Sequence, residues 1–275
     1  MLGIVEFDAT VERTANPCET NPEDLIKMYT IVLATQKGGS GKSTLAIGLS
    51  LAAIQAGHTV RLIETDPQGT LSNWQSRRPY AEPLVEPVYS AGDIERRLES
   101  FDRSGVTLTI IDTAGGASAA TTAAIRHGDL CLIPARPSVA DIEATVSTLQ
   151  TVRAWNKAFA FVLNQTPIRG QRVSNAAIVL GEELAHDLSS VVALPYVVMR
   201  NDHQDALGMG LSVVEYAPTS KSADEIRGLW QWVETKLNSV VILEAQPIVG
   251  ELAASAESIP TMFPQGPSEV PAFGA

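Results

Sequence analysis

A short apolar segment, a glycine-rich turn and a helix follow one another at residues 29–56, and this succession constrains the fold more than any other feature of the chain. Residues 29–35 are β-branched and apolar, which is typical of a buried strand. Glycines crowd the next positions, and a helix is expected over 43–56, ended by Gly57. A buried strand that turns directly into a helix is the building unit of parallel sheets.

The same alternation continues along the chain. It predicts further strands at 59–65, 84–89, 106–112, 130–134, 159–164 and 191–194, and helices at 71–77, 92–103, 117–127, 139–156, 174–187 and 220–237. We therefore expect a single α/β domain over 28–238, with a mostly parallel, twisted sheet and helices on both faces. In such sheets, ligands bind at the carboxyl ends of the strands.

The charge of the chain is concentrated at its two ends. The chain of 275 residues carries 20 Lys and Arg against 31 Asp and Glu, a formal net charge of −11. Residues 1–27 and 239–275 each carry a net charge of −4, and the second segment also contains five prolines. We expect both segments to be flexible extensions. The low pI argues at first sight against a nucleic-acid partner, but the remaining domain is close to neutral and leaves room for a basic face.

Several classes of protein are excluded by what the chain lacks. Its longest apolar run, near 191–199, is far shorter than a membrane span. No positive charge precedes the apolar stretch at the N-terminus, which argues against a secretory signal. Cys18 and Cys131 are too few for a disulfide framework or a metal site. These features predict a protein of the reducing cytoplasm.

The turn after the first strand has the sequence QKGGSGKST at 36–44. Its glycines let the backbone curl so that successive N–H groups surround phosphate oxygens, and the following helix adds its positive end. Lys42 is expected to reach the β and γ phosphates, and the Ser43 hydroxyl to hold Mg²⁺. The predicted nucleotide-binding residues of this loop are Gly38, Gly39, Ser40, Gly41, Lys42, Ser43 and Thr44. Gln36 stands where the general Walker A pattern has glycine, and a second lysine, Lys37, follows it.

This loop resembles the deviant Walker A of the ParA/MinD family of ATPases, and the resemblance extends over about 29–237. Residues 64–69 (ETDPQG) resemble the D-x-D-P-Q-G segment of the family, and residues 110–115 (IIDTAG) resemble its I-I-D-T/C-P-P segment. Residues 134–138 (PARPS), followed by Asp141, resemble P-x-x-P-S-x-x-D. The strand that ends in Asn164, residues 210–216 and residues 221–229 also match. The resemblance implies a P-loop NTPase domain that uses ATP and Mg²⁺.

The resemblance also implies roles for individual residues. Lys37, Lys42 and Asp66 would support hydrolysis, with Lys37 reaching the phosphates of a partner in an ATP-bound homodimer. Ser43, Asp66 and Asp112 would hold the metal, and Asn164 the adenine edge.

From the residues alone, these roles have alternatives. The loop could be a glycine-rich turn with solvated lysines. Asp112 could cap the next helix, Asp66 could form a turn before Pro67, Asn164 could close a strand, and Lys37 could be a solvated surface lysine. Two departures from the family pattern are Glu64, which replaces an aspartate and changes its reach, and Ala114, which replaces a proline and loosens a loop.

The branch of the family is narrowed by elimination. Paired cysteines for an iron–sulfur cluster are missing, and residues 239–275 contain no Lys or Arg for a basic membrane-binding helix. The short ParA type remains, and the resemblance to it implies a slow, partner-stimulated ATPase that positions DNA or a protein cargo while bound to non-specific DNA on the nucleoid. The candidate DNA-binding residues are Lys221, Arg200, Arg227 and Lys236. Two alternatives stay open: an ATPase recruited to the membrane through a partner, and an ATP-dependent metabolic or assembly enzyme.

Overall fold

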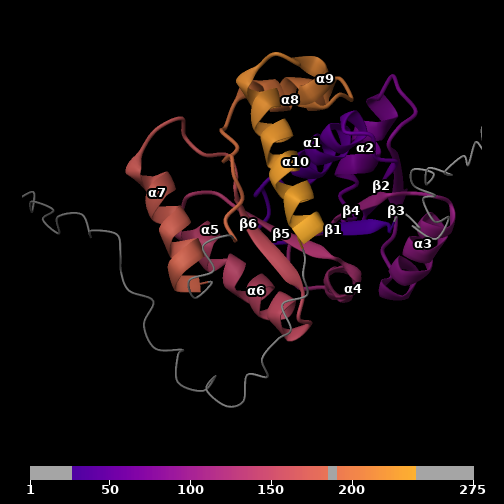
Figure 1. Cartoon of the computed structure of the whole chain (residues 1–275), viewed down its shortest axis with the longest axis horizontal. Helices are drawn as coiled ribbons and strands as arrows, with labels where there is room; N and C mark the ends of the chain where they lie inside the picture. Colours follow the sequence, from indigo (N-terminus) through magenta and orange to yellow (C-terminus); the bar gives the residue numbers. More distant parts are fainter. Residues whose placement is uncertain (1–26, 185–190, 240–275) are drawn as a thin grey trace, which may run out of the picture. The chain divides into compact units, whose positions relative to one another are not determined.

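The computed structural model describes residues 27–184 and 191–239. Six strands form one sheet in which every neighbouring pair is parallel, in the order β3-β2-β4-β1-β5-β6 (Figure 1). The strands are β1 (Tyr29–Leu33), β2 (Val60–Glu64), β3 (Leu84–Pro87), β4 (Leu108–Asp112), β5 (Leu130–Ala135) and β6 (Ala158–Leu163). The predicted α/β architecture is confirmed.

Helices cover both faces of this sheet. On one face lie α1 (Lys42–Gln55), α2 (Thr70–Arg77), α8 (Asn201–Gly208), α9 (Val213–Tyr216) and α10 (Lys221–Ser239). On the other lie α3 (Ala91–Arg103), α4 (Ala119–His127), α5 (Val139–Glu143), α6 (Thr145–Ala154), α7 (Gln171–Ile178) and the π-helix η1 (Val179–Leu184). Successive residues of a strand point to opposite faces of the sheet. In β1, for example, Ile31 packs in the core on the first face and Val32 in the core on the second.

The prediction of a strand at 191–194 is wrong. Phe161 donates to the carbonyl of Val191, and Ala193 donates to the carbonyl of Phe161, which makes one parallel bridge beside β6 and no more. Pro195 follows at once and has no N–H to continue the ladder.

The helix predicted at 139–156 is two helices, α5 and α6, which meet at Ala144. The hydroxyl of Thr145 donates to the carbonyl of Ile142 over 2.7 Å, a local bond that competes with the regular helix ladder. The helix predicted at 174–187 begins earlier, at Gln171, and changes into the π-helix η1. Residues 185–187 of that prediction lie outside the described residues.

The prediction missed α8 and α9. Only Ala206 of α8 is buried, so its sequence carries no apolar stripe, and α9 is four residues long. The expected extensions at 1–27 and 239–275 fall outside the described residues, apart from Lys27 and Ser239. Across 27–184 and 191–239, every helix is too short or too polar to cross a membrane.

Candidate nucleotide-binding site

The glycine-rich loop joins the carboxyl end of β1 to the start of α1. Gly39 and Gly41 have φ angles of 76° and 88°, in the left-handed region that favours glycine. A Cβ at Gly41 would lie 2.2 Å from Nδ2 of Asn164, so this position also has no space for a side chain. Lys42 is the first residue of α1, which places the backbone N–H groups of the loop at a helix N-terminus.

The end of β6 holds this loop from the side. Nδ2 of Asn164 donates to the carbonyl of Ser40 over 2.8 Å, and Nε2 of Gln165 donates to the carbonyl of Gly39 over 3.1 Å. Asn164 is therefore beside the loop, as expected for a nucleotide-binding residue, and its contact with adenine remains a prediction. The contact of Gln165 was not foreseen, because it depends on the spatial adjacency of two distant loops.

The strand order brings the predicted catalytic residues together. β4 lies between β1 and β2, so Lys42, Asp66 and Asp112 come from the carboxyl ends of three neighbouring strands. Burial lowers the pKa of Lys42, while the charges of Asp112 and Asp66 act in the opposite direction. The side chain of Lys42 is buried at the start of α1, where a phosphate group would neutralise it.

Asp112 is fully buried at the end of β4. Burial raises the pKa of its carboxyl group to about 7, and the nearby Ser43 hydroxyl and Lys42 ammonium act against this shift. Neither carboxylate oxygen has a hydrogen-bond partner of normal geometry among the described residues, and the Ser40 hydroxyl in the loop is also buried and unpartnered there. Buried polar atoms of this kind are costly unless a ligand satisfies them, so the residues present fit a hydrated cation and a phosphate.

Asp66 lies in the loop between β2 and α2 and is half-buried. Its Oδ1 accepts from the backbone N–H of Gln68 over 3.0 Å, so the turn-forming role weighed from the sequence is present. Its charge also acts on Lys42 and Asp112, which places it within the same group of charges.

Glu64, the departure from the family pattern, has a role that the sequence did not reveal. Its buried carboxylate accepts from the backbone N–H of Leu71 over 2.6 Å, from that of Ser72 over 3.2 Å, and from the Ser72 hydroxyl. These two N–H groups belong to the first turn of α2, so Glu64 caps that helix across the loop that carries Asp66.

Lys37 lies beside a carboxylate of its own chain. Its Nζ is 3.5 Å from Oδ2 of Asp141. Asp141 also accepts from Nε of Arg136 over 2.9 Å and from Oγ of Ser138 over 2.5 Å. Burial of Asp141 acts against its charged form, yet these bonds and the two neighbouring cations lower its pKa. Lys37 is thus a paired surface lysine, and its action on a partner's nucleotide remains a prediction.

The loop that contains Ala114 packs against the glycine-rich loop. A Cβ at Gly115 would lie 3.5 Å from both the carbonyl oxygen of Gln36 and the backbone nitrogen of Gly38. At Gly115 the two loops therefore approach each other backbone to backbone.

The four candidate DNA-binding residues are not equivalent. Nη1 of Arg200 is 2.6 Å from Oε2 of Glu225, and Nη2 of Arg227 is 2.7 Å from Oδ1 of Asp224. Nζ of Lys236 lies 5.4 Å from the ring centroid of Trp232. Lys221 is exposed at the start of α10 and makes no ion pair within the described part of the chain. Lys221 and Lys236 stand about 22 Å apart along one helix, so they do not form one compact cluster.

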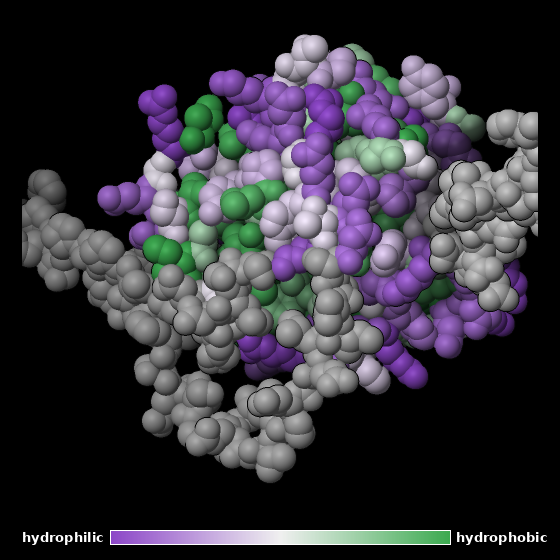
Figure 2. All heavy atoms as spheres, viewed as in Figure 1, coloured by the Kyte–Doolittle hydropathy of each residue, from purple (hydrophilic) through white to green (hydrophobic). Residues whose placement is uncertain are grey.

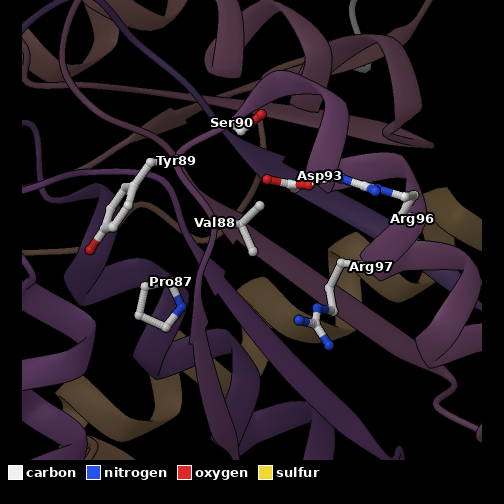
Figure 3. Close-up of a pocket in the computed structure, with 7 residues that line it drawn as sticks. All are labelled: Pro87, Val88, Tyr89, Ser90, Asp93, Arg96 and Arg97. Atoms are coloured by element: carbon white, nitrogen blue, oxygen red, sulfur yellow. Dashed lines mark hydrogen bonds and ion pairs between the residues drawn. The ribbon is translucent and has the colours of Figure 1, made fainter.

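A separate open cavity of about 550 Å³ follows β3 (Figure 3). It is lined by Pro87, Val88, Tyr89, Ser90, Asp93, Arg96 and Arg97. Arg96 is paired with Asp93, and Arg97 with Glu86. Its two cations are already neutralised and no predicted site residue lines it, so we do not assign the nucleotide to this cavity.

The chain belongs to the CobQ/CobB/MinD/ParA nucleotide-binding-domain family, whose model matches residues 31–204. It is 28% identical to the maintenance of carboxysome distribution protein A of Halothiobacillus neapolitanus, over 73% of this chain and 94% of that protein. It is 31% identical to protein ParA of Rhizobium radiobacter, over 46% of this chain and only 56% of the relative. The septum site-determining protein MinD of Pyrococcus horikoshii, complexed with Mg-ADP, has the same fold, with a TM-score of 0.61, 16% identity, and coverage of 78% of this chain and 98% of that one.

Proposed function

We propose that this protein is an ATPase that forms a homodimer with ATP and Mg²⁺ and positions a DNA or protein cargo. The observation that carries the nucleotide part is Asp112, whose two buried oxygens, beside Lys42 and the glycine-rich loop, have no hydrogen-bond partner of normal geometry among the described residues. Family membership and the near full-length match to a carboxysome-distribution protein support the positioning role.

In this proposal the side chains of the site divide phosphate binding, metal binding and hydrolysis among them. Lys42 and the N–H groups of the loop bind the phosphates, Ser43, Asp66 and Asp112 hold Mg²⁺, and Asp66 orients the attacking water. The bound Mg²⁺ would supply positive charge against the phosphate oxygens. Asn164 keeps the loop closed through Ser40 and lies where it could meet the base.

Dimerisation is supported by exposed apolar side chains, some of which lie near the carboxyl end of β6. Figure 2 shows hydrophobic residues gathered on the side of the molecule where α7 lies. Exposed apolar side chains in α7 and in the loops after β6 include Ile168, Ile178, Leu194 and Met199. Ile168 and Met199 flank the bridge between Thr166 and Val198, near the carboxyl end of β6. An apolar area in this position suits contact with a second copy.

The nucleotide part is tested by calorimetric titration of ATP and ADP with Mg²⁺ or with EDTA. We expect binding that requires Mg²⁺ and is lost in Lys42→Ala. Equal binding in Lys42→Ala, or none in the wild type, would contradict the nucleotide assignment.

The DNA part needs a separate test, namely binding to random-sequence duplex DNA with ATP, ADP or no nucleotide across a range of salt. We expect ATP-dependent, salt-sensitive binding that Lys221→Glu weakens. Arg103→Glu, the same charge change at the end of α3, is the matched control. Indifference to DNA in every nucleotide state would refute nucleoid binding while leaving the ATPase assignment standing. An adaptor or cargo protein that stimulates hydrolysis completes the proposal.

A further inference from the structure

The amino ends of three neighbouring strands carry a concentration of positive charge. β1, β5 and β6 are adjacent and parallel, so the residues just before them, at 27–28, 126–129 and 153–157, lie at one end of the sheet. These segments contain Lys27, Arg126, Arg153 and Lys157 but one acid, Asp129. The glycine-rich loop lies at the other end of the same strands, about 17–20 Å away.

Most of the side chains at this end are exposed, and they combine bases with an aromatic ring. The guanidinium of Arg126 stands 5.2 Å from the ring centroid of Trp155, which is 42% exposed. Arg153 is also exposed, and Lys157, which follows shortly after it in the sequence, is half-buried. We refer to Lys27, Arg126, Arg153, Trp155 and Lys157 as the amino-end patch.

The single acid of these segments, Asp129, already has partners within the described residues. Oδ1 of Asp129 is 3.1 Å from Nζ of Lys27, and its Oδ2 accepts from the backbone N–H of Thr30 over 2.8 Å. Within these three segments the bases outnumber the acids by four to one, in a chain whose overall charge is −11. Such a surface attracts a segment that combines carboxylates with apolar side chains, because the carboxylates pair with the bases while apolar groups cover the exposed indole.

We propose that residues 1–26 of the same chain dock on the amino-end patch. This segment carries six acids and one base, and it includes the apolar side chains of Val5 and Phe7. It joins the described part of the chain directly at Lys27, which belongs to the patch. A segment of 26 residues spans at most about 90 Å when extended, so every part of the patch is within its reach.

Tethering makes this contact effective although each exposed ion pair is weak. A surface ion pair contributes only about 0–1 kcal/mol. A segment attached beside its binding surface has an effective concentration in the millimolar range, roughly, so several weak contacts suffice. A free acidic peptide or a nucleic acid would lack this advantage. Since the patch lies at the end of the strands opposite the nucleotide site, docking does not depend on the proposed ATPase function.

The experiment is zero-length carbodiimide cross-linking of the full chain, which joins the Lys157 amine to a carboxylate in direct contact. An equal mixture of ¹⁴N and ¹⁵N chains separates links within one chain from links between chains. We expect links within one chain from Lys157 to acids of 1–26. Their yield should fall about fivefold or more in 0.5 M salt, which needs no variant and therefore no assumption about folding.

A charge-reversal pair tests the patch itself. Arg126→Glu with Arg153→Glu should lower the same yield by about fivefold or more, because repulsion replaces attraction. The matched control is Arg169→Glu with Arg172→Glu, at the carboxyl end of the sheet, which should leave the yield unchanged. Circular dichroism checks that both double variants are folded.

Four results would overturn the proposal. They are a yield no higher than in the urea-unfolded chain, links from Lys157 only to acids of 240–275, links only between chains, and a yield that ignores both salt and charge reversal.

Discussion

Nζ of Lys37 lies 3.5 Å from Oδ2 of Asp141 in the same chain, a carboxylate that Arg136 and Ser138 also bind. The proposed action of Lys37 on a partner's phosphates therefore requires the lysine to leave this carboxylate. Such an exchange is feasible because the Lys37 side chain is 34% exposed and Asp141 keeps two other donors.

Lys37→Ala should keep ATP binding and lose ATP-induced dimerisation or stimulated turnover, because Lys42 and the loop backbone remain in place. Sedimentation velocity with ATP and with ADP measures the dimer, and phosphate release measures turnover. Lys157→Ala, a lysine at the opposite end of the sheet, is the control. Normal dimerisation and turnover in Lys37→Ala would refute the role in trans.

Asp112→Asn should stabilise the nucleotide-free protein at high pH while destroying Mg²⁺-dependent nucleotide binding. The folded pKa of Asp112, about 7, is above its unfolded value, so the folded state binds the extra proton. Its contribution to stability is complete below about pH 4 and is lost as pH rises through 7. At pH 8 the asparagine variant should unfold with a free energy higher by on the order of 2–4 kcal/mol.

Urea unfolding in EDTA at pH 5 and pH 8 measures this difference. The gap between wild type and Asp112→Asn should widen from pH 5 to pH 8. A gap that stays constant would show that burial does not hold the proton on Asp112.

Glu64→Ala should cost about 1–3 kcal/mol of stability, because the buried N–H groups of Leu71 and Ser72 lose their acceptor. Glu64→Gln keeps the length of the side chain and one oxygen acceptor, so it should recover part of the loss. Stimulated turnover should fall in the same order, with wild type highest, Glu64→Gln intermediate and Glu64→Ala lowest. The reason is that the loop carrying Asp66 leads directly into the helix that Glu64 caps. Equal stability of the alanine variant and the wild type would remove the capping role.

Arg78→Ala should be among the most damaging changes outside the site. Arg78 is nearly inaccessible and donates twice to Glu215, over 2.8 and 2.7 Å, which ties α2 to α9. Removing one partner of a buried pair leaves the other charge uncompensated, at a cost of about 3–5 kcal/mol. Urea unfolding of Arg78→Ala, Glu215→Ala and the double variant should give costs that are far from additive. Additive costs would mean that the pair contributes little.

Most of the fold could be predicted from the sequence because the strands are continuous apolar runs, and such runs can be recognised without knowledge of the tertiary structure. The prediction missed α8, where tertiary packing stabilises a polar segment, and it overstated 191–194, where one bridge stands in place of a strand. The loop around Lys42 was found because its glycines and lysines are contiguous. Glu64 caps α2, and Gln165 contacts Gly39. Both contacts join residues that are separate in the chain, so no local sequence pattern predicts them.

The two edges of the sheet determine how copies of this protein can associate. Along β6, Phe161 is bonded to Val191 and Ala193, and Thr166 beyond the strand is bonded to Val197 and Met199. At the other edge, β3 has only four residues and ends in Pro87, which offers no N–H. Strand-by-strand growth into fibres is therefore disfavoured on both sides, and contacts between copies fall to side chains and loops, whose strength a bound ligand or a change of charge can adjust.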